Sequence, residues 1–306
     1  MVDKEYDVVI VGGGPAGLSA GLYAARARLK CLLIERAGTG GWIVNAGVVE
    51  NYPGFPKGVT GLELADLMTE QAKKYGLEIF LAEVSGLEVK GKRKVVKTTE
   101  GNFTAKVVII AGGSDRIKMD VPGEKEFTGR GVAYCALCDA AFYRDVPVAV
   151  VGGGNAAINE ALHLTKFASR VILIHRRKEL RATRILQEKV FAEPKIEILW
   201  DTVVEAVEGK DMVNRLKLRN VVSGEKSALA VSGIFVAIGS RPNTDYLKDI
   251  LTLEANGYIP ANEKMETGIP GVFAAGDIRS NSIRQLVAAA GDGATAAVYA
   301  EKFMAE

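Results

Sequence analysis

Short apolar, β-branched runs alternate along the chain with segments whose apolar residues recur at helical spacing. Residues 6–11 form the first such run, a glycine-rich turn comes next, and residues 18–26 have the spacing of a helix. Residues 30–34 form a second apolar run, which ends in Glu35. Apolar runs of this length on either side of a helical segment are typical of buried parallel strands. The pattern therefore predicts a βαβ unit at the start of the chain.

The same pattern recurs in the middle of the chain, where residues 146–151 and 170–174 predict strands and residues 158–167 predict a helix between them. The chain thus contains an internal architectural repeat. Each repeat is followed by short strands separated by polar residues, as expected of a β-meander. The remaining expected elements are strands at 86–90, 95–99, 105–110, 196–199, 213–218, 234–238 and 271–277 and helices at 62–75 and 284–297. Together these elements predict an α/β fold.

The composition narrows the range of possible functions but does not identify one. A length of 306 residues suggests about two domains. Lys and Arg number 39 against 37 Asp and Glu, so no strong overall field favours nucleic acid or an anionic membrane surface. The charged residues 1–7 do not resemble a signal peptide, and no apolar stretch is long enough to span a bilayer. We therefore expect a cytoplasmic protein that recognises its partner locally.

The first glycine turn, residues 12–17, has the spacing of a dinucleotide-binding fingerprint. Gly12 permits a tight turn, Gly14 lets the backbone approach a pyrophosphate at the helix N-terminus, and Gly17 allows close packing of helix and strand. The carboxylate of Glu35, at the end of the next strand, can accept hydrogen bonds from both hydroxyls of an adenosine ribose and would repel a 2′-phosphate. This site is predicted to prefer a dinucleotide with a free ribose.

The second glycine turn, residues 152–157, differs from the first at the end of its next strand. His175, Arg176 and Arg177 stand where an acid would be expected, with Arg181 one helical turn beyond. Guanidinium groups suit a 2′-phosphate because they form paired, charge-assisted hydrogen bonds, so this site is predicted to prefer NADPH. A solvated basic face is the alternative interpretation.

Two of the three cysteines form the motif Cys135-x-x-Cys138, directly before Asp139. Zinc usually needs four ligands, and the one other cysteine and the two histidines of the chain do not have the spacing of such a site. If the pair opens a helix, the free N–H groups there can stabilise a thiolate. A redox dithiol is therefore favoured over a metal site or a pair of buried, reduced thiols, and Cys31, inside an apolar strand, is expected to be inert.

Two further features suggest ligand contacts. Residues 38–61 form a Gly/Pro-rich segment, and such long loops usually bind or cover something. Its Trp42 could stack beside a flavin or could simply fill the loop. Asp277 ends an apolar strand, the place where an open α/β sheet puts ligand contacts, although an ordinary turn aspartate would look the same.

Taken together, these motifs resemble the low-molecular-weight thioredoxin reductases over essentially the whole chain. The resemblance is carried by GGGPAG at 12–17, ENYPG at 50–54, Cys135-x-x-Cys138-Asp139, GGGN at 152–155, HRR at 175–177, RPNT at 241–244, GD at 276–277 and RQ at 284–285. It implies two Rossmann-like domains of three-layer ββα architecture. An FAD-binding domain at 1–114 and 244–306 would be interrupted by an NADPH-binding domain at 115–243 that carries the dithiol.

The resemblance also implies roles for individual residues. FAD would occupy the first site, with Glu35 on the adenosine ribose, Asp277 on the ribityl side and Arg284 with Gln285 near the flavin ring, and NADPH would occupy the second. The further positions that it assigns to cofactor binding are Gly12, Gly14, Pro15, Ala16, Gly17, Arg36, Gly41, Trp42, Asn51, Gly112, Gly152, Gly154, Asn155, Ala156, His175, Arg176, Arg177, Arg181, Ile238, Gly239, Gly276, Leu286 and Ala289.

The implied reaction carries electrons from NADPH through FAD to the Cys135–Cys138 disulfide, and by thiol–disulfide exchange to thioredoxin or a glutaredoxin-like protein. Asp139 would act as the acid. The family pattern puts Cys138 nearer the flavin, but the residues do not decide which sulfur attacks the partner. A hinge rotation of the inserted domain and a homodimer are further implications of the resemblance.

Two groups of alternatives remain open at this stage. The same fold could take electrons from reduced ferredoxin or a deazaflavin, or pass them to a peroxide-reducing partner or dioxygen. The sequence at 175–177 argues against a donor without a 2′-phosphate, and the absence of an N-terminal thioredoxin-like extension argues against a self-contained peroxide system. The second group consists of one alternative to an enzyme, a non-catalytic redox sensor that binds both nucleotides.

Overall fold

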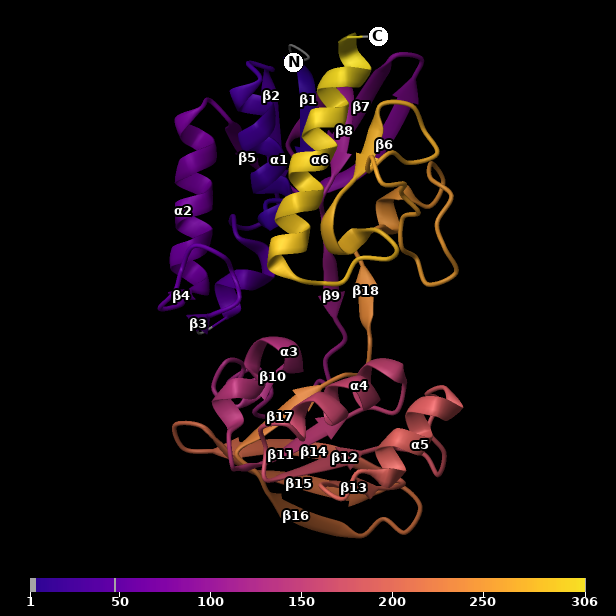
Figure 1. Cartoon of the computed structure of the whole chain (residues 1–306). Coiled ribbons are helices and arrows are strands. Elements are labelled where there is room, and N and C mark those ends of the chain that lie inside the picture. The colour runs from indigo at the N-terminus through magenta and orange to yellow at the C-terminus, as the bar shows by residue number, and fades with distance from the viewer. Residues whose placement is uncertain (1–3, 47, 306) are drawn as a thin grey trace. The chain divides into compact units, whose positions relative to one another are not determined.

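The computed structural model describes residues 4–46 and 48–305, which form two compact units. The discontinuous unit comprises Met1–Asp115 and Arg241–Glu306, and the inserted unit comprises Arg116–Ser240. The chain passes from one unit to the other through two short strands, β9 (Ser114–Arg116) and β18 (Ser240–Pro242), which pair with each other. Figure 1 shows the course of the chain through both units.

A seven-stranded sheet forms the centre of the discontinuous unit. Its order is β5-β2-β1-β8-β7-β6, and β19 pairs with β8. The strands β5, β2, β1, β8 and β19 are parallel, whereas β8, β7 and β6 form an antiparallel meander. Both faces of the parallel part are covered, so Val8, Val9 and Ile10 are fully buried and the strand sequence is apolar without a break. The strands are β1 (Lys4–Val11), β2 (Cys31–Glu35), β5 (Glu78–Leu81), β6 (Val84–Lys90), β7 (Arg93–Thr98), β8 (Gly101–Ile110) and β19 (Val272–Ala274).

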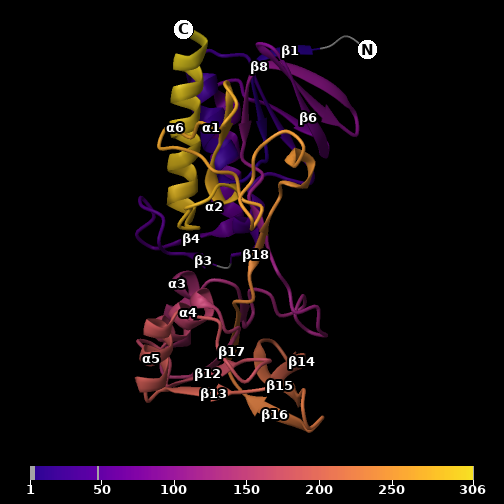
Figure 2. The same cartoon turned by 90° about the vertical axis from the view of Figure 1, so that its right-hand side faces the viewer.

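Three helices share a hydrophobic core with one face of this sheet. They are α1 (Pro15–Arg26), α2 (Gly61–Lys74) and α6 (Leu286–Ala305). Local sequence explains two of their starts, since Pro15 fits the first helical turn and the Thr60 hydroxyl accepts the Glu63 N–H at 3.2 Å. Helices α1 and α6 lie side by side (Figure 2). A Cβ on Gly293 of α6 would lie 1.9 Å from the Ala16 carbonyl oxygen, so this contact requires glycine.

The inserted unit has three layers (Figure 2). A five-stranded parallel sheet of order β10-β17-β11-β12-β13 is the middle layer. Helices α3, α4 and α5 cover one face, and an antiparallel sheet of order β14-β15-β16 covers the other. The elements are β10 (Val132–Ala133), α3 (Ala136–Asp139), β11 (Pro147–Val151), α4 (Asn155–Leu164), β12 (Arg170–Ile174), α5 (Arg184–Ala192), β13 (Ile196–Leu199), β14 (Thr202–Gly209), β15 (Val213–Asn220), β16 (Lys226–Ala230) and β17 (Gly233–Val236).

The structure confirms the predicted α/β class and the internal repeat, and it corrects the second meander. The runs at 196–199 and 234–238 are not meander strands, because β13 and β17 belong to the buried parallel sheet. The meander consists of β14, β15 and β16 instead, and most of β16 is exposed, so it carries no apolar run that could predict it. Residues 175–183 also form a loop and not a helical turn, since α5 begins only at Arg184.

The remaining short elements lie in loops. They are β3 (Val48–Val49), β4 (Val59–Thr60), and the 3-10 turns η1 (Gly41–Asn45), η2 (Ala140–Tyr143), η3 (Asp245–Leu247) and η4 (Gly276–Ile278). Within residues 4–46 and 48–305, no helix combines the length and the apolar character that crossing a membrane would require.

Candidate redox and nucleotide-binding sites

The first glycine turn forms an open backbone cradle at the start of α1. Gly12 has φ +106°, and a Cβ there would lie 2.4 Å from the Ala111 carbonyl oxygen. A Cβ on Gly17 would lie 1.8 Å from the Gly12 oxygen, so both positions require glycine. Above Gly14 the space is different, because no atom of the described chain comes within 4 Å of an added Cβ. Open space over the N-terminus of a helix is what a bound pyrophosphate needs.

Glu35 lies against this turn. Its Oε2 accepts the Gly13 N–H at 2.6 Å and its Oε1 accepts the Ala37 N–H at 3.1 Å, which fixes the carboxylate at the end of β2 beside the cradle. Its neighbour Arg36 is turned to a different partner, an ion pair with Asp115 at 3.4 Å on the surface. Glu35 is therefore held in the position that the fingerprint predicts, whereas the guanidinium of Arg36 is engaged elsewhere.

The C-terminal segment of the chain completes this region. Gly276 has φ +78°, and a Cβ there would lie 2.9 Å from that of Ala16, which places η4 directly against the start of α1. The Gly276 N–H donates to Asp292 Oδ2 at 3.1 Å, and Arg279 forms a buried ion pair with the same carboxylate at 2.6 Å. Asp277 next to it accepts the Ser282 hydroxyl at 2.9 Å.

Asp292 and Arg279 were not predicted from the sequence. Both support the turn that carries Gly276 and Asp277, and the signal that could have revealed them is an acid inside the small-residue helix α6. A charged residue buried in such a helix needs a partner.

Several predicted positions meet in the same unit. Asn51 Nδ2 donates to Gln285 Oε1 at 3.3 Å, although the two lie far apart in the sequence. The guanidinium of Arg284 donates to the Tyr258 hydroxyl at 2.9 Å and lies over its ring. The Gly112 carbonyl accepts from Asn243 Nδ2 at 2.9 Å. Leu286 and Ala289 belong to the first turn of α6, whose Ala289 comes close to Gly276.

The Gly/Pro-rich segment also approaches the first glycine turn. A Cβ on Gly41 would lie 3.1 Å from Gly14 Cα, which brings η1 next to the cradle. The small core of this segment is made by Val49, Val59 and Leu64 with other apolar side chains. Trp42 is not part of that core and is 39% exposed, so it does not fill the loop.

The second glycine turn has the same backbone form. Gly152 has φ +151°, a Cβ there would lie 2.5 Å from the Ala237 carbonyl oxygen, and again no described atom lies within 4 Å of a Cβ on Gly154. Helix α4 starts at Asn155, with Ala156 in its first turn. Gly239, with φ +128°, comes after Ile238 at the end of the parallel sheet, close to Ile117.

His175 is packed against the second glycine turn. Its side chain is 5% exposed and packs so tightly that a Cβ on Gly153 would lie 2.2 Å from the ring. Its Nε2 is 2.9 Å from the Glu179 carbonyl oxygen, and burial lowers the pKa of the imidazole. His175 therefore supports the glycine turn as a packed side chain.

The three arginines of this loop are arranged differently. The Arg181 N–H donates to the Gly153 carbonyl at 2.7 Å, and Asn155 Oδ1 accepts the Thr183 N–H at 2.9 Å, so the loop is tied to the turn. The side chains of Arg176, Arg177 and Arg181 are exposed, and within the described part of the chain none of them belongs to an ion pair of 4 Å or less. Cationic groups of this kind, next to a cradle, suit an anionic ligand.

Cys135 and Cys138 form a disulfide in the inserted unit. Cys135 is the N-cap residue of α3, and its Sγ accepts the Cys138 N–H at 3.2 Å, so the pair does open a helix as the sequence suggested. Cys138 is exposed, whereas Cys135 is half-buried. The apolar side chains of Leu137 and Phe142 are 58% and 52% exposed beside the disulfide. Cys31 is buried and burial raises the pKa of its thiol to about 11, in keeping with an inert core residue.

Two carboxyl groups near the disulfide have perturbed acidity. Burial raises the pKa of Asp139 to about 6, so this group binds a proton far more readily than an ordinary aspartate does. Burial raises the pKa of Glu160, on α4, to about 7, an effect that Arg116 opposes and Asp139 reinforces. Glu160 was missed in the sequence, although its spacing from Ala157 and Leu164 places it on the buried face of the helix.

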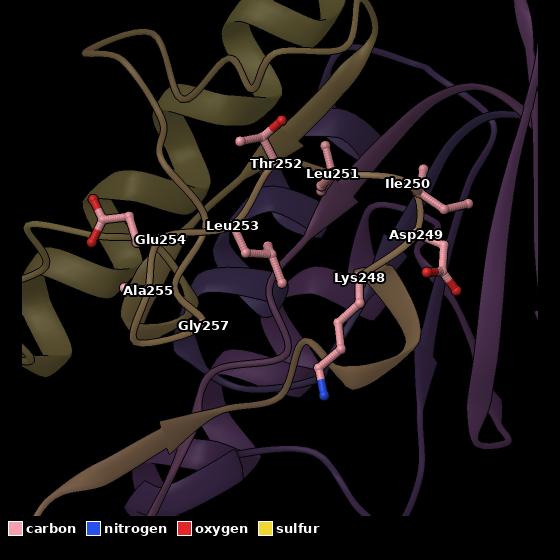
Figure 3. Close-up of a pocket in the computed structure, with 9 residues that line it drawn as sticks. All are labelled: Lys248, Asp249, Ile250, Leu251, Thr252, Leu253, Glu254, Ala255 and Gly257. Carbon is pink, nitrogen blue, oxygen red and sulfur yellow. The ribbon is translucent and has the colours of Figure 1, made fainter.

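One surface cavity of the discontinuous unit lies apart from these sites. It has a volume of about 550 Å³ and is lined by residues 248–255 and 257. Figure 3 shows the charged ends of Lys248, Asp249 and Glu254 pointing in different directions, so the cavity lacks converging polar groups. Within the described ranges, no group of three or more His, Cys, Asp or Glu side chains is placed to hold a metal ion.

Comparisons with known proteins agree with this geometry. Residues 6–293 match the family model described as pyridine nucleotide-disulphide oxidoreductase. The chain is 44% identical to the thioredoxin reductase of Peptoclostridium acidaminophilum over 99% of its own length and 98% of the relative's, and 44% identical to that of Bacillus subtilis (strain 168) over 99% and 96%. The crystal structure of thioredoxin reductase from Streptococcus pyogenes is 41% identical, covers 99% of both chains and has a TM-score of 0.96. A match of this extent shows that the chain belongs to the pyridine nucleotide-disulphide oxidoreductase family.

Proposed function

We propose that this chain is an NADPH-dependent thioredoxin reductase. In this proposal the discontinuous unit binds FAD, the inserted unit binds NADPH, and the Cys135–Cys138 disulfide passes electrons to the disulfide of thioredoxin or a glutaredoxin-like protein. The observation that carries the proposal is the combination, within one unit, of an N-capping disulfide, the buried acid Asp139 and a second nucleotide cradle flanked by exposed arginines. Relatives that match over nearly the full chain are named thioredoxin reductase.

The residues present fit both cofactors. The space over Gly14 and over Gly154 is open, and each lies at the N-terminus of a helix. Glu35 would hold the adenosine ribose of FAD, and Arg176, Arg177 and Arg181 would hold the 2′-phosphate of NADPH. When bound, the two cofactors supply the two electrons that opening a disulfide requires.

The chemistry of the chain itself begins once the disulfide is open. One of the two cysteines, as the thiolate, attacks a sulfur of the partner's disulfide, and a mixed disulfide forms while one partner thiolate leaves. The other cysteine then attacks the mixed disulfide, which restores Cys135–Cys138 and releases the partner as a dithiol. The N–H of Cys138, which already donates to Cys135 Sγ, can stabilise a thiolate there. Asp139 can protonate a leaving thiolate because its raised pKa keeps a proton available.

The surface around the disulfide suits a protein substrate. Leu137 and Phe142 are exposed apolar side chains, before and after Cys138 in the sequence, and such side chains at the centre of an interface contribute much of its binding free energy.

The proposal also includes the homodimer that the family resemblance implies, which sedimentation of the flavin-loaded protein would detect directly.

The decisive test is coupled turnover. The purified protein with bound FAD should oxidise NADPH rapidly only when thioredoxin is present, and Cys138→Ser should lose this activity while its flavin absorbance is unchanged. Cys31→Ser is the matched control, because this buried thiol lies outside the site, and it should keep the activity. Equal turnover by Cys138→Ser and the unmodified protein would refute the dithiol mechanism.

A further inference from the structure

A buried carboxylate without any assigned role is hydrogen-bonded to Tyr134, the residue that precedes the disulfide. Glu124 is 3% exposed, yet it belongs to neither nucleotide cradle. Its Oε1 accepts the Met119 N–H at 3.0 Å and the Tyr134 hydroxyl at 2.9 Å, and its Oε2 accepts the Asp120 N–H at 2.8 Å. A buried carboxylate is costly unless it is hydrogen-bonded, so three donors aimed at one group indicate a specific arrangement.

One end of this arrangement fixes the first residues of the inserted unit. The Ile117 N–H donates to the Gly239 carbonyl at 3.0 Å, directly after the connecting strand β9, and Met119 and Asp120 come next. Asp120 has φ +56°, a left-handed conformation that is unfavourable for a residue with a side chain. The hydrogen bond from its N–H to Glu124 offsets that cost, so the strained turn depends on the carboxylate.

The other end fixes the residue that precedes the disulfide. Val132 and Ala133 are held in the parallel sheet as β10, Cys135 is the N-cap of α3, and Tyr134 is the single residue between them. Burial and the hydrogen bond to Glu124 raise the pKa of the Tyr134 phenol, so the hydroxyl stays a donor. Tyr134 is thus anchored through its side chain at the point where the backbone leaves the sheet and enters the redox helix.

We propose that Glu124 is a positioning residue for the redox disulfide, acting through Tyr134 on the N-cap residue Cys135. The proposal rests on the proposed function, because it concerns the disulfide that reduces the partner protein. A disulfide is favoured over its dithiol to the extent that the fold holds both sulfur atoms in place. Anchoring Tyr134 limits the freedom of Cys135 in the dithiol state, which favours closure of the disulfide and makes the dithiol a stronger reductant.

The test compares a substitution that removes the Tyr134 side of the contact with one that weakens the Glu124 side. Tyr134→Phe deletes only the hydroxyl, and Glu124→Gln replaces one acceptor oxygen by an amide that cannot serve all three donors. The flavin-loaded variants are equilibrated with mixtures of reduced and oxidised dithiothreitol, and free Cys135 and Cys138 are counted after alkylation. In this exchange the enzyme disulfide gains the two electrons and two protons that dithiothreitol loses on ring closure. Both variants should shift the equilibrium three- to tenfold toward the enzyme dithiol.

Matched controls come from the other unit, where the Tyr6 hydroxyl donates to Glu78 Oε2 at 2.9 Å. Tyr6→Phe and Glu78→Gln alter the same kind of hydrogen bond in the unit that does not carry the disulfide, and they should leave the equilibrium unchanged even where they lower the melting temperature. Combining Tyr134→Phe with Glu124→Gln should shift the equilibrium by less than the product of the two single effects, because both remove the same contact.

The outcomes separate this proposal from a purely structural role. An equilibrium within twofold of the unmodified protein in Tyr134→Phe would overturn it, whether or not Glu124→Gln folds. An equal shift in the Tyr6→Phe control would also overturn it, because the effect would then be global. The measurement needs no protein acceptor, so it stays valid if thioredoxin is not the substrate, a result that coupled turnover would reveal separately.

Discussion

The two glycine turns of this protein are copies of one backbone design that have diverged at the side chains around them. Each position of the first corresponds to the position 140 residues later in the second, so Gly12 matches Gly152 and Glu35 matches His175. Both turns keep a positive φ at the first glycine and open space above the third. The backbone therefore provides the site for a pyrophosphate in both cases, and the neighbouring side chains set what else each site prefers.

The side chains of the two sites differ most at the end of the strand that follows each glycine turn. In the first site the carboxylate of Glu35 accepts the Gly13 N–H. In the second, the imidazole of His175 packs on Gly153 and the next residues are exposed arginines. A carboxylate repels a 2′-phosphate and an arginine attracts it, so this exchange of charge would account for the two nucleotide preferences that we propose.

The helices that begin at the turns also differ. Ala20 of α1 is fully buried under α6, whereas the matching residue of α4 is Glu160, whose pKa is raised by burial. Where α6 crosses it, the first helix carries the small residues Ala16 and Ala20. Helix α4 lies next to α3, the helix that carries Asp139. At the position that corresponds to Ala20 it can carry an acidic side chain.

The largest expected effects come from closing one cradle at a time. Gly14 and Gly154 both have φ values that any residue adopts, and both have open space, so valine should be accommodated in the folded chain and clash only with a bound nucleotide. Gly14→Val should purify without flavin. Gly154→Val should keep its flavin but raise the KM for NADPH at least 1,000-fold, about 4.1 kcal/mol of binding free energy.

Flavin absorbance and steady-state kinetics measure these two effects, with circular dichroism as the check on folding. The comparison of the two sites would fail if Gly154→Val lost its flavin while Gly14→Val retained it.

A smaller effect on nucleotide binding is expected from removing positive charge at the second site. Arg176→Ala combined with Arg177→Ala should reduce the preference for NADPH over NADH by about 100-fold, since loss of two charge-assisted hydrogen bonds costs roughly 3 kcal/mol. Lys178→Ala, an exposed cation on the same loop, is the matched control and should leave the preference nearly unchanged. The ratio of kcat/KM for the two nucleotides measures this, and an unaltered ratio in the double variant would return both arginines to a solvated surface role.

The smallest effect concerns stability and pH. The folded-state pKa of Glu160, about 7, lies above its ordinary value of 4.5, so the folded state binds the proton more tightly than the unfolded state. The resulting stability is fully present below about pH 4.5 and is lost as the pH rises through about 7, by roughly 3 kcal/mol in total. Glu160→Gln should flatten this decline, and Glu188→Gln, an exposed acid of the same unit, should not. Chemical denaturation between pH 4 and 8 measures it, and equal slopes in all three proteins would contradict the assignment.

Much of this organisation can be predicted from the sequence because it depends on local backbone requirements. The glycine turns, Glu35 and the capping cysteine are set by spacings of a few residues, and the structure places each as expected. Contacts between distant segments were not accessible in this way. Asp292 supports Gly276 across 16 positions, Asn51 meets Gln285 across 234, and β16 lacks an apolar pattern because it lies at the surface.

His175 shows a different limit of the sequence. Its place at the end of β12 was correct, but a motif does not indicate whether a side chain faces a ligand or the core. The 2.2 Å approach to Gly153 and the contact with the Glu179 carbonyl decide for the core. In the proposed function, recognition of the phosphate is therefore assigned to its exposed neighbours Arg176 and Arg177.

The close packing of Gly293 against Ala16 has a consequence for biosynthesis. Helix α6 is translated after every other helix and strand of the two units, yet it covers the helix that starts at the first glycine turn, and β19 completes the sheet beside β8. The inserted unit is a continuous segment and can fold while its downstream sequence is still being translated, since domains generally fold as units during synthesis. The first nucleotide site must wait until α6 has left the ribosome, so a nascent chain still lacking α6 should acquire its second cradle before its first.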